Sequence, residues 1–231
     1  MVYWINILNN LMKTLNTYIN EWKLTDDSKT KVSFYNFFPE TKEELSSLIH
    51  KRLEDNPTKP DLLDISTVKL NDLSGIFAGT GSKYCLNGYG IGSIEELDLH
   101  TWDVSNVESF ECMFHKCYSL KKLNLSGWNT HKARNINGMF EECESLESLD
   151  LSNFDTRNIR IMTWVFCRCK KLKKLNLSGW KTSKVTTIEE MFYNCIRLEE
   201  IKGIENWDIS NIMNKANAFL YCNISPSWYK N

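Results

Sequence analysis

The sequence has almost no net charge, because 28 lysine and arginine residues balance 29 aspartate and glutamate residues to a formal charge of −1. Binding to nucleic acids or anionic membranes through bulk electrostatics needs an excess of positive charge, and no long block of one sign supplies it. With 42% hydrophobic and 25% charged residues in 231, the composition is that of a folded protein, not a disordered one. We therefore expect no nucleic-acid partner.

Residues 1–23 lack the unbroken apolar run of a transmembrane helix. They also lack the basic segment, apolar core and small-residue cleavage site of a secretory signal. Their apolar residues recur at helical spacing between asparagines and lysines, which predicts an amphipathic helix over residues 5–23. We expect no membrane insertion. By default these features favour a cytoplasmic protein whose eight cysteines are reduced thiols.

The common patterns of catalytic and cofactor sites are also missing. The four histidines share no spacing and complete no triad with a nucleophile and a carboxylate. The stretch GTGSKYCLNGYGIG contains glycines but not the order of a phosphate-binding loop. The cysteines do not form the clustered pairs typical of metal sites. We therefore predict a non-enzymatic protein with no catalytic residues, no metal and no cofactor.

The dominant feature that is present is an internal repeat. Phenylalanine recurs at spacings of 26, 26, 26 and 27 residues, and a cysteine follows three positions after each copy. The repeat continues as L-x-x-L-x-L-S-x-W-x-T, and its period falls within the roughly 20 to 29 residues of leucine-rich repeats. The phenylalanines are Phe114, Phe140, Phe166, Phe192 and Phe219.

Each repeat changes periodicity in its middle. The Leu-x-Leu segment alternates as a strand does, with Leu123 and Leu125 on one face. The segment NVESFECMFHKC places apolar residues on one face of a helix. We therefore predict an α/β solenoid, with the strands in one parallel β-sheet and short helices on the opposite side. We expect the repeated cysteines, methionines and large aromatic residues to fill the core between them.

Charges before each strand support stacking in register. The residue two positions before the first strand leucine alternates in charge sign from one repeat to the next. Opposite charges should therefore face each other on adjacent strands. Such exposed ion pairs contribute only about 0 to 1 kcal/mol each to stability. We expect their main effect to be on the alignment of adjacent strands. The residues are Glu95, Lys121, Glu147, Lys173 and Glu199.

The strings LSGWNT, LSNFDT and LSGWKT, each between a Leu-x-Leu segment and a Met-Phe or Val-Phe segment, resemble the BspA-like leucine-rich repeats of bacterial surface proteins. The resemblance extends from about residue 61 to 224, and FFPETKEELSSLI is similar to the leader before such arrays. It implies an adhesion or surface-recognition function and a cell-surface location. These repeats serve as a scaffold for different partners, so the resemblance identifies no particular partner.

We divide the chain into an N-terminal helical cap region over residues 1–60, the repeats over 61–224 and a tail over 225–231. Thr41 and Glu44 form a capping-box pattern that predicts the start of a capping helix. At the other end, Trp228 and Tyr229 are the residues available to cover the last repeat.

We predict that the outward face of the sheet binds a protein partner, because solenoid sheets present extended surfaces. The predicted binding residues are Glu96, Asp98, His100, Lys122, Asn124, Ser126, Ser148, Asp150, Ser152, Lys174, Asn176 and Ser178.

Two alternatives from other classes stay open. The first is an enzyme with a site between the N-terminal helices and the insertion around Cys85, which is the one thiol expected to be reactive. The second is a structural or assembly protein that oligomerises through the helix predicted over residues 5–23. Neither the oligomeric state nor the identity of a partner follows from the sequence.

Overall fold

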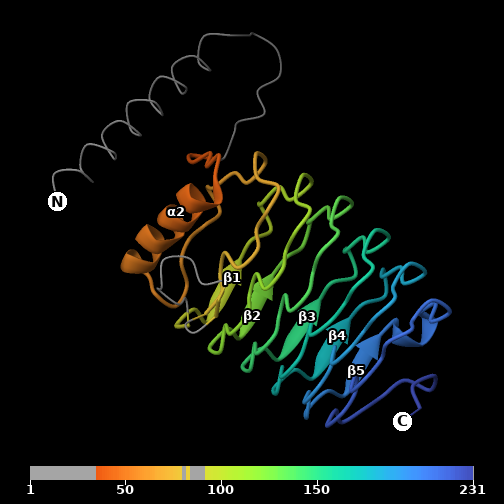
Figure 1. The fold of residues 1–231 in the computed structure, drawn as a ribbon. Helices are drawn as coiled ribbons and strands as arrows, with labels where there is room; N and C mark the ends of the chain where they lie inside the picture. The colour runs from red at the N-terminus through yellow and green to blue at the C-terminus, as the bar shows by residue number, and fades with distance from the viewer. Residues whose placement is uncertain (1–34, 80–81, 84–91, 231) are drawn as a thin grey trace. The chain divides into compact units, whose positions relative to one another are not determined.

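The computed structural model describes residues 35–79, 82–83 and 92–230. The helix predicted over residues 5–23 and the loop around Cys85 lie outside the described residues. Within them, one α-helix precedes a row of short strands that follow one another in chain order (Figure 1). No described helix is both long enough and apolar enough to cross a membrane. The elements are α2 (Lys42–Asp55), β1 (Glu96–Asp98), β2 (Lys122–Asn124), β3 (Ser148–Asp150), β4 (Lys174–Asn176), β5 (Glu200–Lys202) and the 3-10 helix η2 (Ile204–Asn206).

The strands pair in parallel, and each residue lies beside its counterpart in the next repeat. Leu97 pairs with Leu123, and Leu149 with Leu175. This confirms the predicted register. The architecture is therefore a repeat-like α/β fold with small parallel sheets.

The expected single sheet is wrong, because the strands form two sheets, β1-β2 and β3-β4-β5. Lys121 and Lys122 form ion pairs of 2.8 and 2.7 Å with Glu95 and Glu96 on the β1 side. On the other side, Ser148 of β3 holds the repeat position that Lys122 holds in β2, so this position carries no charge in β3. Among the described residues, neither an ion pair nor a backbone hydrogen bond joins β2 to β3.

The short helices expected in each repeat are also wrong, because these segments form turns. Their alternate N–H groups donate to the next repeat: Cys112 to the carbonyl of Asn137 at 2.9 Å, and Phe114 to that of Met139 at 2.8 Å. The intervening Met113 N–H closes a turn onto the Phe110 carbonyl at 3.1 Å. A helix would direct every N–H along its own axis and leave neighbouring repeats without these bonds.

This path requires a left-handed backbone at two positions in each repeat. The left-handed positions recur in two columns, and most of the residues there are not glycine, so the turns carry no glycine signature in the sequence. Each non-glycine residue in this conformation costs roughly 1–2 kcal/mol, which the bonds between repeats must offset. The first column is Gly75, Cys112, Gly138, Trp164, Glu190 and Asn217, and the second is Lys116, Glu142, Arg168, Asn194 and Tyr221.

The repeated phenylalanines stack in a continuous buried column, as predicted. Phe140 lies between Phe114 and Phe166, with ring centroids 5.5 Å away on both sides and ring planes within 6° and 1° of parallel. The column continues from Phe77 to Phe219. These contacts bury one large ring per repeat.

The large aromatic residues after the strands form a second buried column, which confirms their predicted core role. The indole N–H of Trp128 donates to the Leu99 carbonyl at 2.8 Å, and that of Trp180 to the Leu151 carbonyl at 3.0 Å. Phe154 has no such donor. There the side-chain amide of Asn153 donates to the Leu125 carbonyl at 3.3 Å in its place.

Both ends of the repeats are covered as predicted. At the N-terminal end, the Thr41 hydroxyl accepts a hydrogen bond from the Glu44 N–H at 3.2 Å and caps α2. Lys42 then joins the helix to the first repeat, donating to the Ser74 carbonyl at 3.2 Å. At the C-terminal end, Trp228 stacks on Trp207 at 6.2 Å, and Tyr229 packs on Phe219 at 4.9 Å.

We expect Phe140→Ala to lower the free energy of unfolding by about 3–5 kcal/mol, because it leaves a cavity inside a stacked column. Phe38, which is 43% exposed, provides the control: Phe38→Ala should cost less than about 1 kcal/mol. Urea unfolding followed by circular dichroism measures both. Equal losses in the two variants would contradict the buried column.

Candidate functional site

The twelve predicted binding residues share one surface of the strands, and none of them is buried. In every strand except β2 the central residue is buried, and the flanking residues are half-buried or exposed. The structure therefore brings the predicted residues together as an outward face. Whether this face binds a partner stays a prediction.

Charges at the β1-β2 end of the face neutralise one another. The Glu96 carboxylate lies 2.7 Å from the Lys122 ammonium and 2.8 Å from that of Lys59. Hydrogen bonds, first from Lys122 and then from Lys59, lower the pKa of Glu96 to about 2. Partial burial raises the pKa of Asp98, but hydrogen bonds from His100 outweigh it, so this pKa lies below its ordinary value.

The polar residues in the middle of the face also have a structural role. An oxygen of each side chain accepts a hydrogen bond from the N–H two residues later, which closes the turn after the strand. The Asn124 and Asn176 amides then donate to the carboxylates of Asp98 at 2.9 Å and Asp150 at 3.0 Å. The four turn bonds join Asp98 to His100, Asn124 to Ser126, Asp150 to Ser152 and Asn176 to Ser178.

The other end of the face is hollowed over a volume of about 280 Å³. The hollow includes four of the predicted residues, and it adds Glu200 and Lys202 of β5, which the prediction omitted. These two occupy the same columns as Lys174 and Asn176, so the repeat spacing could have identified them. The lining residues are Leu123, Ser148, Leu149, Asp150, Lys174, Leu175, Asn176, Glu200 and Lys202.

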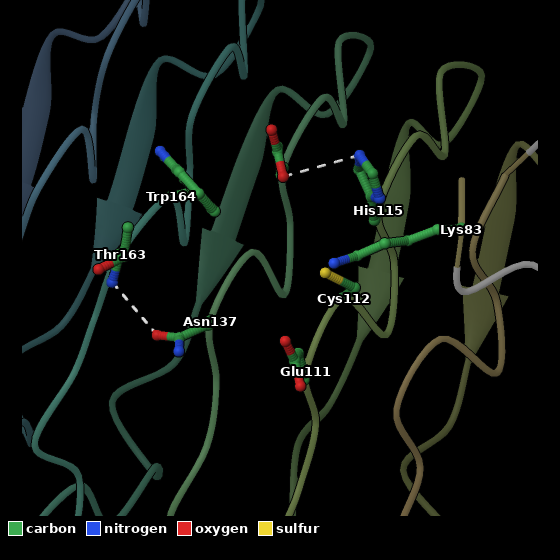
Figure 2. Close-up of a pocket in the computed structure, with 8 residues that line it drawn as sticks. Lys83, Glu111, Cys112, His115, Asn137, Thr163 and Trp164 are labelled. Carbon is green, nitrogen blue, oxygen red and sulfur yellow. Dashed lines mark hydrogen bonds and ion pairs between the residues drawn. The ribbon is translucent and has the colours of Figure 1, made fainter. Parts of the chain in front are cut away.

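A second hollow, of about 330 Å³, lies on the turns (Figure 2). Gly138 holds the position that Cys112 occupies one repeat earlier and Trp164 one repeat later, so its missing side chain leaves room between them. Trp164 is 45% exposed. The sequence did not reveal this hollow, because the spacing of the apolar residues predicted a helix for this segment. The lining residues are Lys83, Glu111, Cys112, His115, Asn137, Glu141, Thr163 and Trp164.

His115 and Glu141 meet in this second hollow, with 3.6 Å between the His115 Nε2 and a Glu141 carboxylate oxygen (Figure 2). Burial lowers the pKa of His115 and raises that of Glu141, so both groups are shifted towards their neutral forms. The hollow borders Lys83, which belongs to the insertion around Cys85. The sequence left open an enzyme site beside this insertion. The two residues come from adjacent repeats, so only their spacing of 26 residues could have connected them.

Four of the repeated cysteines, Cys117, Cys143, Cys169 and Cys195, are buried free thiols, as predicted, and Cys222 in the last repeat is half-buried. Each of the four buried thiols donates to the phenylalanine carbonyl of the preceding repeat, as Cys143 does to Phe114 at 3.2 Å and Cys169 to Phe140 at 3.1 Å. Burial raises the pKa of the Cys143 and Cys169 thiols, which suppresses the reactive thiolate. Cys85 lies outside the described residues, and its reactivity stays a prediction.

Comparison with known proteins assigns a family. The model of the family described as "Mycoplasma protein of unknown function, DUF285" matches the chain twice, over residues 58–148 and 135–225. The chain belongs to this family. The same family model matches two successive, overlapping parts of the chain, in keeping with a tandem array. The sequence matches neither a curated protein nor a solved structure.

We expect Gly138→Ala to lower the free energy of unfolding by about 1–2 kcal/mol, because φ there is +59° and a Cβ atom would lie 3.0 Å from the Cys112 sulfur. Gly92→Ala is the matched control, since its Cβ would meet nothing within 4 Å. Urea unfolding of both variants measures the difference. A Gly138→Ala protein as stable as the control would argue against this turn.

We expect stability to fall as pH rises above about 8.5, where thiols in the unfolded chain ionise. Burial raises the pKa of Cys143 in the folded chain and that of Cys167 to about 12, so the folded state keeps protons that the unfolded state has lost. Their stabilisation is complete below the unfolded pKa and is lost as pH approaches the folded pKa.

Each such thiol contributes about 1.4 kcal/mol per pH unit to this decline. Cys143→Ala should therefore flatten the decline between pH 9 and 10 by about that amount, as measured by urea unfolding at several pH values. Identical slopes for the variant and the unmodified protein would show that Cys143 does not behave as a buried thiol.

Proposed function

We propose that the chain is a non-enzymatic protein-binding module, built as a solenoid whose outward sheet face holds the partner. The hollow of about 280 Å³ on that face carries the proposal. Its lining combines the half-buried Leu123 with charged groups from β3, β4 and β5, which together offer a small apolar contact and several directed polar contacts.

The proposed contact centres on β4 and β5, where charged side chains form no ion pair among the described residues. Glu96 and Asp98 already have partners on the protein, whereas Lys174, Glu200 and Lys202 form no ion pair among the described residues. Charges without a partner are available to one that docks, and they favour a complementary surface over others. We therefore place the centre of the interface over β3 to β5.

The solenoid part of the proposal is supported by the stacked columns. Phenylalanine, cysteine and the large aromatic residues each recur behind one another, and each strand pairs with its counterpart in a neighbouring repeat. In such arrays a repeat contacts only its neighbours, and the strands form an extended surface suited to protein partners.

The resemblance to BspA-like repeats supports the finer suggestion that the module takes part in adhesion or recognition at a surface. The matched family is itself described as of unknown function. Adhesion is therefore proposed from the strings LSGWNT, LSNFDT and LSGWKT together with the exposed face, not from any relative of known activity.

The experiment compares two double charge reversals in capture from extracts and surface fractions, with bound proteins identified by mass spectrometry. Lys174→Glu with Lys202→Glu alters the hollow, and we expect it to reduce capture of a specific partner at least about tenfold. Lys184→Glu with Arg197→Glu makes the same change in net charge at exposed positions outside it, and should leave capture intact.

Circular dichroism melting of both variants verifies that they are folded. A partner captured equally by the two variants would remove the sheet face from the proposal. Loss of the partner in both would indicate general electrostatic attraction and would equally contradict a defined interface.

A further inference from the structure

The second hollow brings together residues that could ligate a metal ion. His115 and Glu141 occupy the same position in adjacent repeats, and Glu142 follows directly. One nitrogen or oxygen of each residue lies within 4.8 Å of those of the other two. The next repeats carry Cys167 and Tyr193 at this position, so the arrangement occurs at one place in the array.

The distances suit one ion between the side chains. Ligands about 2.0–2.2 Å from a tetrahedral zinc ion are about 3.4 Å apart, and the His115 Nε2 lies 3.6 Å from the Glu141 carboxylate oxygen. Both side chains are largely shielded from water, with 12% and 17% of their surface exposed.

Surrounding hydrogen bonds orient these side chains. The His115 Nδ1 lies 2.9 Å from the Ser82 hydroxyl, and in the tautomer that carries its proton on Nδ1 this nitrogen donates to the hydroxyl and leaves Nε2 available to ligate a metal. Glu142 accepts hydrogen bonds from Tyr118 at 2.8 Å and Arg168 at 3.0 Å. A carboxylate has about four acceptor positions, so these two bonds leave capacity for a metal.

The nature of the neighbouring residues indicates which ion. Cys112 precedes His115 by three residues and lines the same hollow (Figure 2). Imidazole and thiol groups favour Zn²⁺ and similar transition metals, whereas Mg²⁺ and Ca²⁺ require oxygen ligands. Lys83 also lines the hollow, and its positive charge opposes any bound cation.

We propose that His115, Glu141 and Glu142 form a site for a divalent transition metal ion of the zinc type, beside the thiol of Cys112. The site joins two repeats next to the insertion, and it is separate from the proposed partner-binding face. Its success or failure leaves the proposed protein-binding function unaffected.

The test titrates Zn²⁺ into the chelator-treated, reduced full chain by isothermal calorimetry, with Mg²⁺ as a second arm. We expect one Zn²⁺ per chain and no Mg²⁺ binding. Glu141→Gln, which keeps the size of the side chain, should weaken Zn²⁺ binding on the order of 10- to 100-fold, and His115→Ala should do the same.

Two controls separate this site from others on the chain. His131→Ala removes an exposed histidine outside the hollow and should leave affinity unchanged. Lys83→Ala should strengthen Zn²⁺ binding, because it removes a positive charge that repels a bound cation. The same substitution should not strengthen the binding of an uncharged ligand.

Absence of Zn²⁺ binding would overturn the proposal. So would a site that Glu141→Gln and His115→Ala leave intact, or one that His131→Ala weakens equally. Circular dichroism establishes that each variant is folded, and Glu141→Gln provides the decisive result if His115→Ala does not fold.

Discussion

Hydrogen bonds between adjacent repeats are the constraint on which the rest of the structure depends. In the turns, alternate N–H groups donate to the following repeat, as Phe114 does to Met139 and Phe140 does to Val165. These bonds keep like residues behind one another, so the phenylalanine rings can stack and the cysteine thiols can reach the carbonyls of the preceding repeat. Buried backbone groups that would otherwise lack partners are satisfied by the same pairing.

Both candidate sites follow from this stacking. On the sheet, columns of side chains from successive strands produce a face that is neutralised at β1 and β2, and at β4 and β5 it carries charges that form no ion pair within the described part of the chain. On the turns, a single glycine between Cys112 and Trp164 opens a hollow beside His115 and Glu141. Both candidate sites therefore lie where individual residues differ from the repeat consensus, and not at positions that every repeat shares.

The features that could be predicted from the sequence are those that depend on the spacing of its residues. The register of Leu149 with Leu175, the buried aromatic columns and the Thr41 cap all follow from spacing, because spacing determines which side chains can be buried together. It did not predict the turns, because the buried residues there share the spacing of a helix and residues such as Glu142 and Arg168 adopt a left-handed backbone. It also missed the pairing of His115 with Glu141, which only the stacking of repeats brings about.

The central claim is that the segments between strands bond across repeats and not along a helix. Scalar coupling across hydrogen bonds, measured by NMR on the deuterated protein, tests it directly at Phe140. The account predicts a coupling from the Phe140 N–H to the carbonyl of Val165, with which it forms a bond of 2.9 Å. A coupling to the carbonyl of Ile136, four residues earlier, would indicate a helix and contradict the account.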